Sequence, residues 1–174
     1  MRIITLIVLS FCLTAGAGRS ETEAGPARNE VVSVSQDDGL VGKKFTDVRE
    51  AGVDGKYHSL SEYAGKGKWV LVDFWASWCG PCKREMPNVT AAYKKYHAKG
   101  LEVVAYSFDR DKDAWVRAIG SWDMPWIHFI NSKVGNVYDV RAIPDNILID
   151  PSGTIVARGL RGEQLEETLS EIFK

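Results

Sequence analysis

The chain has 174 residues, of which 45% are hydrophobic, and its formal net charge is −1. This size and composition allow one domain with an ordinary hydrophobic core and exclude a disordered chain. Acidic and basic residues are scattered along the sequence, which leaves no basic face for nucleic acid and no polybasic membrane patch. We therefore expect proteins or small molecules as partners.

The first segment has the three parts of a secretory signal peptide. Arg2 precedes an apolar run over residues 3–13, and the small residues 15–17 follow it. The run is shorter than the roughly 20 apolar residues that span a bilayer, so an uncleaved anchor is the weaker alternative. We expect residues 1–17 to be removed and the mature protein to be extracytoplasmic, in the periplasm of a bacterium.

Cys12 lies inside this apolar run, in a context that faintly resembles a bacterial lipoprotein processing site. Such sites have a small residue where Phe11 stands, so lipidation, the one route to membrane attachment, is less favoured than cleavage. Cleavage after Ala17 leaves two cysteines, Cys79 and Cys82. Two cysteines are too few for the disulfide framework of a small secreted scaffold.

The folded domain is expected over residues 40–174, after a flexible leader at 18–39 that has little periodicity. Strands at 45–48 and 56–60 should flank the turn-forming pair Asp54-Gly55 in an opening β-hairpin. Ser59 or Ser61 would then cap a short helical turn ending at Gly65.

A buried strand that feeds directly into a helix comes next. Residues 69–75 are apolar at both odd and even positions, except for Asp73. This pattern is typical of a central strand that is covered on both faces. Residues 81–99 carry apolar side chains at helical spacing and close at Gly100, and Pro87 should kink this helix.

The remaining segments alternate between strand and helix patterns and end in a second hairpin. The expected elements are a strand at 101–108, a helix at 111–119 ending at Gly120, strands at 126–130, 146–150 and 154–158, and a helix at about 162–173. The recurring strand, helix and strand favour a parallel sheet and an α/β fold.

The main candidate for a redox site lies between strand 69–75 and the following helix, at Trp78-Cys79-Gly80-Pro81-Cys82. A helix N-terminus offers unpaired N–H groups and the positive end of a dipole, and both favour a thiolate at Cys79. Pro81 suits the first turn because its missing N–H costs nothing there, and the two-residue spacer lets the sulfurs pair. We expect Cys79 to be the exposed nucleophile and Cys82 the resolving thiol.

Two other interpretations of the Cys-x-x-Cys pair are weaker. A zinc site needs further ligands, but His58, His97 and His128 are widely separated in the sequence. A purely structural disulfide would close so short a loop that it removes little entropy from the unfolded chain. We therefore expect redox catalysis, with no metal and no cofactor other than the redox-active disulfide.

Two acidic residues flank the motif. Asp73 lies on an apolar strand, so its carboxyl should be desolvated, with a raised pKa, and able to exchange a proton with the resolving thiol. The alternative is an Asp at a strand end in contact with water. Glu85 lies three residues after Cys82, on the same helix face, although a Glu on an amphipathic helix is usually solvated.

The block VDFWASWCGPCKREMP, residues 72–87, resembles the active-site block of TlpA/ResA-type thioredoxin-like oxidoreductases, which are related to the AhpC/TSA redoxins. The resemblance covers about residues 40–174. It implies a thioredoxin fold, a central mixed β-sheet flanked by helices, with an N-terminal β-hairpin extension and a central insertion. It also implies reduction of protein disulfides outside the cytoplasm, often in cytochrome c maturation, with a membrane thiol–disulfide transporter as electron donor.

The resemblance assigns further residues to the site. It implies a cis peptide before Pro144, where the residues alone favour an ordinary trans proline, and an Ile143 backbone that pairs with substrate. It also places Trp78 against substrate and Glu85 near the cysteines. The candidate catalytic residues are thus Cys79, Cys82, Asp73 and Glu85, and the candidate substrate-binding residues are Trp78, Gly80, Pro81, Ile143 and Pro144.

One position departs from the family pattern. Asp145 and Asn146 follow Pro144 where small hydroxyl residues are common. A carboxylate aimed at the sulfurs would disfavour the Cys79 thiolate, and we expect Asp145 to point to solvent instead. We also expect core positions for the other central tryptophans and for the segment 122–129, because aromatic residues dominate burial, and the weaker alternative for this segment is the lining of a substrate groove.

Two other functional classes are alternatives. A thiol peroxidase of the peroxiredoxin type has Thr three residues before its reactive cysteine, where this chain has Ala76. A non-catalytic binding or chaperone module would not need Cys79 and Cys82. The Gly80-Pro81 spacer resembles that of reducing thioredoxins and favours the reductase direction.

Overall fold

The computed structural model describes residues 39–130 and 133–174. The expected signal peptide at 1–17, Cys12 and nearly all of the expected leader lie outside these residues. Within the described ranges, no helix is both long enough and apolar enough to cross a bilayer.

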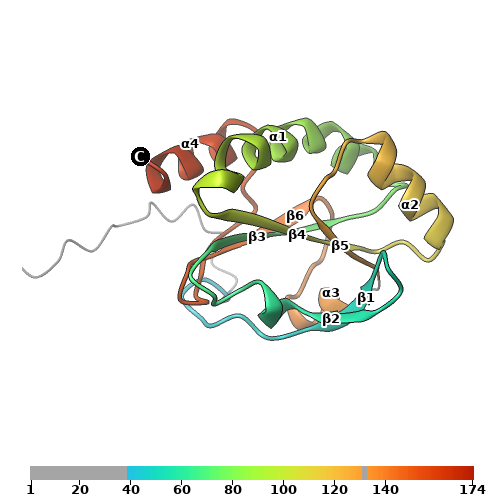
Figure 1. The fold of residues 1–174 in the computed structure, drawn as a ribbon, viewed down its shortest axis with the longest axis horizontal. Coiled ribbons are helices and arrows are strands. Elements are labelled where there is room, and N and C mark those ends of the chain that lie inside the picture. The colour runs from blue at the N-terminus through green and yellow to red at the C-terminus, as the bar shows by residue number, and fades with distance from the viewer. Residues whose placement is uncertain (1–38, 131–132) are drawn as a thin grey trace, which may run out of the picture. The chain divides into compact units, whose positions relative to one another are not determined.

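A mixed seven-stranded sheet, in the order β2-β1-β5-β4-β3-β6-β7, is the centre of the fold (Figure 1). The strands are β1 (Arg49–Gly52), β2 (Tyr57–Ser59), β3 (Trp69–Trp75), β4 (Leu101–Ser107), β5 (Ile127–Ile130), β6 (Asp145–Ile149) and β7 (Ile155–Arg158). Strands β3, β4 and β5 are parallel, whereas β1, β2, β6 and β7 pair antiparallel with their neighbours. The sheet is therefore mixed, as the family resemblance implies, and not purely parallel.

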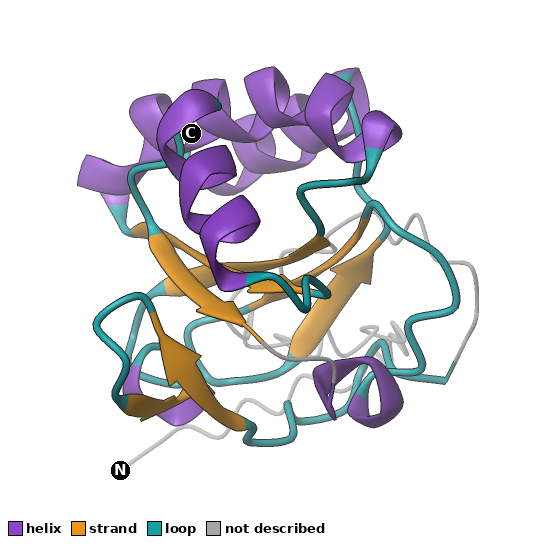
Figure 2. Cartoon of the chain, turned by 90° about the vertical axis from the view of Figure 1, so that its right-hand side faces the viewer, coloured by secondary structure: helices purple, strands orange, loops and turns teal. Residues whose placement is uncertain are grey.

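Helices cover both faces of this sheet (Figures 1 and 2). The longer helices α1 (Gly80–Tyr96), α2 (Lys112–Ser121) and α4 (Glu163–Ile172) lie on one face. The short helix α3 (Lys133–Val137) lies on the other face, and η1 (Leu60–Glu62) packs against the same core as α3. A short turn, η2 (His97–Lys99), extends α1 and ends at Gly100 in the left-handed conformation, as expected.

Strand β3 positions the site because it lies between β4 and β6 and is buried on both faces. Alternate residues of a strand point to opposite faces of the sheet. Leu71 and Trp75 pack into the core beneath α1, whereas Phe74 packs into the core on the α3 side. Asp73 shares the parity of Leu71 and Trp75, so its carboxyl points into the layer that contains α1.

The opening hairpin is shifted from its expected position. The turn at Asp54-Gly55 forms, but the first strand is β1 and not residues 45–48. The reason is that Phe45 donates its N–H to the carbonyl of Gly153, at 2.9 Å, on the turn before β7. Segment 45–48 is thus held by a distant part of the chain. Strand β1 then joins the hairpin to the main sheet through β5.

The central insertion implied by the resemblance corresponds to α2 and β5, which lie between β4 and α3. Helix α2 continues through Gly120 to Ser121, so the expected end at Gly120 is wrong. The left-handed residue after the helix is Asp123, with φ of 52°. Helix α3 was not expected, because its five residues are too few to show a helical period.

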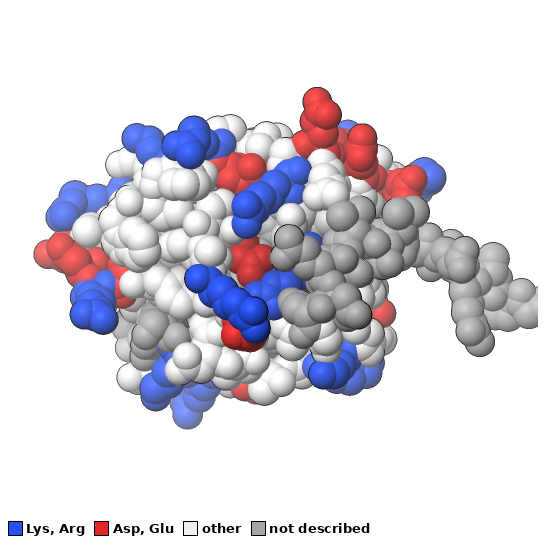
Figure 3. Space-filling model, turned by 180° about the vertical axis from the view of Figure 1, so that it is seen from behind, with Lys and Arg blue, Asp and Glu red and all other residues white. Residues whose placement is uncertain are grey.

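Charged side chains are interspersed on the surface. On the face seen from behind in Figure 3, Lys and Arg alternate with Asp and Glu, and neither sign covers the face alone.

Candidate active site

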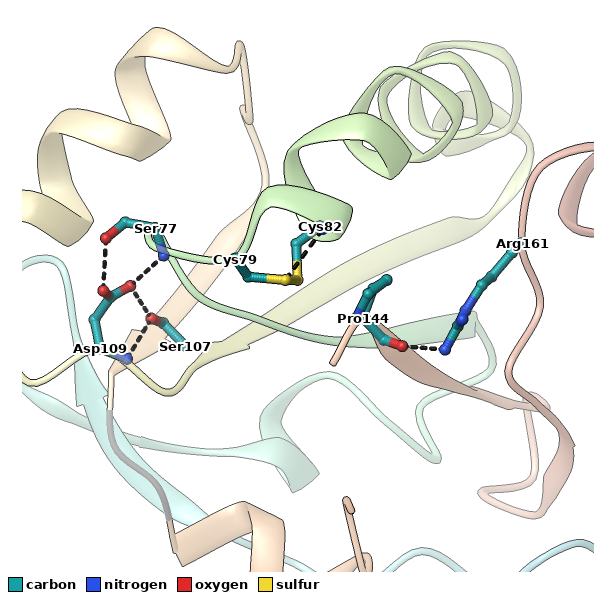
Figure 4. Close-up of a disulfide and its surroundings, with 7 residues drawn as sticks. All are labelled: Ser77, Cys79, Cys82, Ser107, Asp109, Pro144 and Arg161. Carbon is teal, nitrogen blue, oxygen red and sulfur yellow. Dashed lines mark hydrogen bonds between the residues drawn. A yellow bond between two sulfur atoms is a disulfide. The ribbon is translucent and has the colours of Figure 1, made fainter. Parts of the chain in front are cut away.

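Cys79 and Cys82 form a disulfide at the N-terminus of α1, with an S–S distance of 2.00 Å (Figure 4). Cys79 is the N-cap of the helix, and its Sγ accepts a hydrogen bond from the Cys82 N–H at 3.1 Å. Gly80 and Pro81 form the first turn, where the missing N–H of proline leaves no hydrogen bond unmade. The disulfide thus lies between the end of a buried strand and the positive end of the helix dipole of α1.

The two sulfurs differ slightly in accessibility. Cys79 is 4% exposed and Cys82 is fully buried, so Cys79 is less exposed in the disulfide form than expected. The Trp78 ring beside it is 68% exposed, unlike Trp75 and Trp115, which lie fully in the core. Cys79 is nevertheless the more exposed of the two cysteines, and Trp78 is the large exposed side chain next to it.

Asp73 is buried, as its position on an apolar strand predicts. The residue is 1% exposed, and its Oδ2 has no hydrogen-bond partner, so the alternative of a strand-end Asp in water is wrong. Burial, together with the smaller effects of the charges of Glu85 and Asp145, raises the pKa of this carboxyl to about 7. A group with this pKa can bind or release a proton near neutral pH.

Glu85 is partly buried between α1 and the start of α4. Its Oε1 accepts a hydrogen bond from the Gly162 N–H at 2.8 Å, and Gly162 is the N-cap residue of α4. Glu85 is therefore held by the backbone and is not a freely solvated helix residue. Its negative charge is close enough to Asp73 to affect the pKa of that carboxyl.

The peptide between Ile143 and Pro144 is cis, as the family resemblance implies, and the trans alternative is wrong. Figure 4 shows Pro144 on the side of the disulfide opposite to Ser77. The guanidinium of Arg161 donates a hydrogen bond to the Pro144 carbonyl. The loop before α4 therefore holds the proline through Arg161 and the active-site helix through Glu85.

Asp145 is buried in an ion pair, so the expectation that it points to solvent is wrong. Its Oδ2 lies 2.6 Å from Nη2 of Arg158, and both side chains are nearly buried. Asp145 pairs with Phe74 across the sheet, which places it on the α3 face, whereas Asn146 pairs with Asp73 on the α1 face. The carboxylate of Asp145 therefore lies on the opposite face of the sheet from the carboxyl of Asp73.

Another buried carboxylate, that of Asp109, was missed by the sequence analysis. It accepts hydrogen bonds from the Ser77 N–H at 2.8 Å, the Ser77 hydroxyl at 2.6 Å and the Ser107 hydroxyl at 2.6 Å (Figure 4). The Asp109 N–H in turn donates to the Ser107 Oγ at 3.0 Å. This cluster fixes the chain two residues before Cys79. The only sequence signal for it is the polar Ser-x-Asp pattern at the end of a buried strand.

A groove of about 1340 Å³ joins Trp78, the residue before Cys79, to the N-terminal hairpin, although neither cysteine lines it. It is lined on the site side by Trp78 and Ile143 and on the hairpin side by Ala51 and Tyr57. The segment 122–129 does not line it, and Trp122 and Trp126 pack against the core as expected.

Comparisons with known proteins agree with this architecture. The AhpC/TSA family model matches residues 41–158. The thiol-disulfide oxidoreductase ResA of Bacillus thuringiensis subsp. konkukian is 32% identical over 136 residues, which are 77% of each chain. That of Oceanobacillus iheyensis is 37% identical over 125 residues, covering 69% of this chain and 64% of the relative.

Solved structures show the same fold. The thioredoxin domain of a thiol-disulfide oxidoreductase from Bacteroides vulgatus superposes with a TM-score of 0.72 at 31% identity, covering 77% of this chain and 98% of that domain. A thiol:disulfide interchange protein from Bacteroides sp. gives a TM-score of 0.70 at 33% identity, covering 76% and 90%. With its disulfide at the N-terminus of α1, this chain belongs to the AhpC/TSA family and, within it, is a thioredoxin-fold thiol–disulfide oxidoreductase of the TlpA/ResA type.

Proposed function

We propose that this protein reduces disulfides of exported proteins outside the bacterial cytoplasm, with Cys79 as nucleophile and Cys82 as resolving thiol. The observation that carries the proposal is the Cys79–Cys82 disulfide at the N-terminus of α1, above a buried Asp73 whose pKa is about 7. The site can therefore form a thiolate at one sulfur and move a proton at the other.

The reaction begins with the reduced protein. The Cys79 thiolate, favoured by the helix N-terminus, attacks one sulfur of the substrate disulfide. A mixed disulfide forms, and the other substrate sulfur leaves as a thiolate. The Cys82 thiolate then attacks the Cys79 sulfur and releases the second substrate sulfur. The substrate gains two electrons, and the protein ends in the disulfide form.

Asp73 is proposed to take up the proton of the Cys82 thiol in the second step. Both residues face the same layer, because Cys82 packs into the core beneath α1 with Trp75, which shares the parity of Asp73. A carboxyl with a pKa of about 7 accepts a proton at neutral pH and releases it afterwards. Burial is the main cause of this high pKa, and the charge of Glu85 raises it as well and so supports the proton transfer.

Substrate is proposed to lie between Trp78 and the Ile143–Pro144 peptide. The exposed Trp78 ring supplies contact area beside Cys79, and Ile143 lines the adjoining groove. The backbone of Ile143 would pair with an extended substrate segment, and Arg161 holds the neighbouring Pro144 carbonyl in place. Gly80 and Pro81 complete the rim as the exposed first turn of α1.

The sequence supports the proposed location, and the family resemblance supports the proposed electron donor. A signal peptide at residues 1–17 supports export to the periplasm, with lipidation at Cys12 as the alternative. An exported reductase has to be re-reduced by electrons from the cytoplasmic side, which favours a membrane thiol–disulfide transporter as donor. Precursors of c-type cytochromes, which must be reduced before haem attachment, are the proposed substrates.

The reduction potential of the Cys79–Cys82 pair tests the direction. We expect a value near that of thioredoxin, about −270 mV, measured by tryptophan fluorescence against a dithiothreitol series. A value near about −120 mV would make the protein an oxidant and overturn the reductase assignment.

A trapping experiment tests the roles of the two cysteines. The variant Cys82→Ser should accumulate mixed disulfides through Cys79, because the resolving thiol is absent. The matched variant Cys79→Ser should capture nothing. Equal capture by both variants, or capture by Cys79→Ser alone, would show that the assigned order is wrong.

A further inference from the structure

The loop between β7 and α4 bonds to three parts of the active site. The Arg161 guanidinium donates to the Pro144 carbonyl (Figure 4). The Gly162 N–H donates to Oε1 of Glu85 at 2.8 Å. The third contact is with the side chain of Asn146, on strand β6. The first two contacts hold residues that the proposed reaction uses, and the third one leads to Asp73.

The side-chain amide of Asn146 is bound at both ends by the backbone of one loop residue. Its Nδ2 donates to the Leu160 carbonyl at 2.7 Å, and its Oδ1 accepts from the Leu160 N–H at 3.0 Å. Asn146 is 2% exposed, so both bonds are shielded from water. The plane of the amide is therefore fixed, because turning it would leave the buried polar groups of Leu160 unpaired.

Asn146 is also the cross-strand neighbour of Asp73. The two residues are directly opposite each other in the antiparallel pair of β3 and β6, so both side chains point to the α1 face of the sheet. The Cβ atoms of such a pair are about 4.5–5.5 Å apart, which brings the side chains within reach of each other. Yet no hydrogen bond joins the Asn146 amide to Asp73, whose Oδ2 has no partner in the described part of the chain.

A donor at this position would change the acidity of the Asp73 carboxyl, because a hydrogen bond to a carboxylate favours its charged form and lowers its pKa. Burial raises the pKa of Asp73, and the charges of Glu85 on α1 and Asp145 on β6 act in the same direction. On β4, the residue paired with Asp73 is Ala105, which has no polar side-chain group. Asn146 is thus the polar side chain that the sheet pairs with this carboxyl.

We propose that Asn146 is a positioning residue: its amide, held by the neighbouring loop, withholds a hydrogen bond from Asp73 and keeps that carboxyl basic enough to take up the proton of Cys82. The proposal rests on the proposed function, in which this proton leaves the Cys82 sulfur, binds an Asp73 oxygen and frees the thiolate that attacks Cys79. Asn146 itself exchanges no proton and acts only through Asp73.

A matched pair of variants tests the proposal. Asn146→Thr supplies a hydroxyl that can donate to the Asp73 carboxylate, whereas Asn146→Val has the same shape and no donor. Both variants lose the bonds to Leu160, so any effect of a looser loop is common to the two. The bonds made by Arg161 and Gly162 remain in both and hold the loop. Asn146→Ser and Asn146→Ala differ by the same hydroxyl and replace this pair if the branched side chains prevent folding.

Carbon NMR of the Asp73 carboxyl, titrated in the oxidised protein, measures the effect without a titrating thiol at the site. Asp73→Asn identifies the resonance, because its spectrum lacks it. We expect a midpoint near pH 7 in the wild type and in Asn146→Val, and a midpoint about one pH unit lower in Asn146→Thr.

Three results of this titration would overturn the proposal. A wild-type midpoint in Asn146→Thr would show that position 146 does not act on Asp73. An equally lowered midpoint in Asn146→Val would attribute the shift to a looser loop. A raised midpoint in Asn146→Val would show that the wild-type amide already donates to Asp73.

The pH dependence of product release, measured with a synthetic peptide that contains one disulfide, separates positioning from structure. Asp73 must be ionised to accept the proton, so release should increase with pH around pH 7 in the wild type and about one unit lower in Asn146→Thr. The earlier attack by Cys79 does not need Asp73, so its rate should not follow this shift.

The two measurements together distinguish this proposal from the function on which it rests. A lowered NMR midpoint in Asn146→Thr with a wild-type release profile would show that Asp73 is not the proton acceptor, and would overturn the role of Asn146 with it. Failure of the wild type to reduce any disulfide would instead refute the proposed function, whatever the titration of Asp73 shows.

Discussion

Asp73 and Asp109 are buried carboxyl groups that differ in their hydrogen bonds. Asp73 lies within β3, and Asp109 lies two residues after the end of the neighbouring strand β4. Asp73 is 1% exposed and Asp109 is 6% exposed. Yet Oδ2 of Asp73 has no partner, whereas the Asp109 carboxylate accepts three hydrogen bonds. The two carboxyl groups are thus buried to a similar extent, and they differ in the number of hydrogen-bond donors around them.

This difference separates a group that exchanges protons from one that holds the backbone. Without donors, the charged form of Asp73 is disfavoured, so its pKa rises to about 7 and its proton becomes mobile at neutral pH. With donors on Ser77 and Ser107, Asp109 is a fixed acceptor that orders the turn before Cys79. Replacing each Asp by Asn should therefore have opposite effects on stability.

The largest expected effect is a stabilisation by Asp73→Asn. The folded-state pKa of Asp73 lies above its ordinary value of 3.8, so the folded protein binds this proton more tightly than the unfolded chain does. Stability from this group is present below about pH 4 and is lost as the pH rises to about 7, a loss of about 4 kcal/mol. Asn cannot ionise and avoids this loss.

Urea denaturation of the oxidised protein at several pH values measures this effect. The Asp73→Asn variant should match the wild type near pH 4 and exceed its free energy of unfolding by up to about 4 kcal/mol above pH 7. A variant that is less stable than the wild type at pH 8 would show that Asp73 has a stabilising partner in the folded state.

The contribution of His128 to stability depends on pH in the opposite way from that of Asp73. Burial lowers its pKa from 6.5 to about 4, and its Nδ1 has no hydrogen-bond partner. A lowered histidine pKa means that stability is complete above about pH 6.5 and is lost as the pH falls to about 4, by about 3 kcal/mol. In the wild type, the contributions of Asp73 and His128 largely cancel between pH 4 and 7.

Single variants should reveal each contribution. The change His128→Gln keeps an amide that can bond to the Met124 carbonyl, which His128 Nε2 contacts at 3.1 Å. The stability of the His128→Gln variant should fall with rising pH more steeply than the stability of the wild type. The stability of the Asp73→Asn variant should instead rise with pH. Parallel pH curves for the two variants and the wild type would contradict both assignments.

The activity of Asp73→Asn is expected to fall by about 100-fold at neutral pH, the range typical of general acid–base catalysis. The variant should form the mixed disulfide at nearly the wild-type rate, because Cys79 attacks first, and should release product slowly. Stopped-flow measurement of the two steps separates them. A wild-type release rate in this variant would assign the proton transfer to another group.

Features that depend on neighbouring residues could be predicted from the sequence. The cysteine pair, the helix that follows it and the burial of Asp73 all lie within one short block, where the alternation of strand β3 fixes the direction of each side chain. The left-handed end of the first long helix at Gly100 is equally local. Secondary-structure patterns and the motif were therefore sufficient for these features.

Features that depend on distant partners could not be predicted. Asp109 contacts Ser77 from 32 residues away, and Arg161 contacts Pro144 from 17 residues away. Asp145 was expected to point to solvent, but it is the first residue of β6 and pairs with Arg158, 13 residues away on β7.

The smallest expected effect completes the comparison. Asp109→Asn should lower the free energy of unfolding by about 2 kcal/mol, because an amide replaces one oxygen that accepts from buried or backbone donors. The change from carboxyl to amide is the same as in Asp73→Asn, but the expected change in the free energy of unfolding has the opposite sign. Ser107→Ala, which removes one hydroxyl donor and keeps the carboxylate, is the control and should cost about 1 kcal/mol. If Asp109→Asn stabilises the protein as Asp73→Asn does, the two carboxyls are equivalent, and the hydrogen bonds to Ser77 and Ser107 do not explain the order of the turn before Cys79.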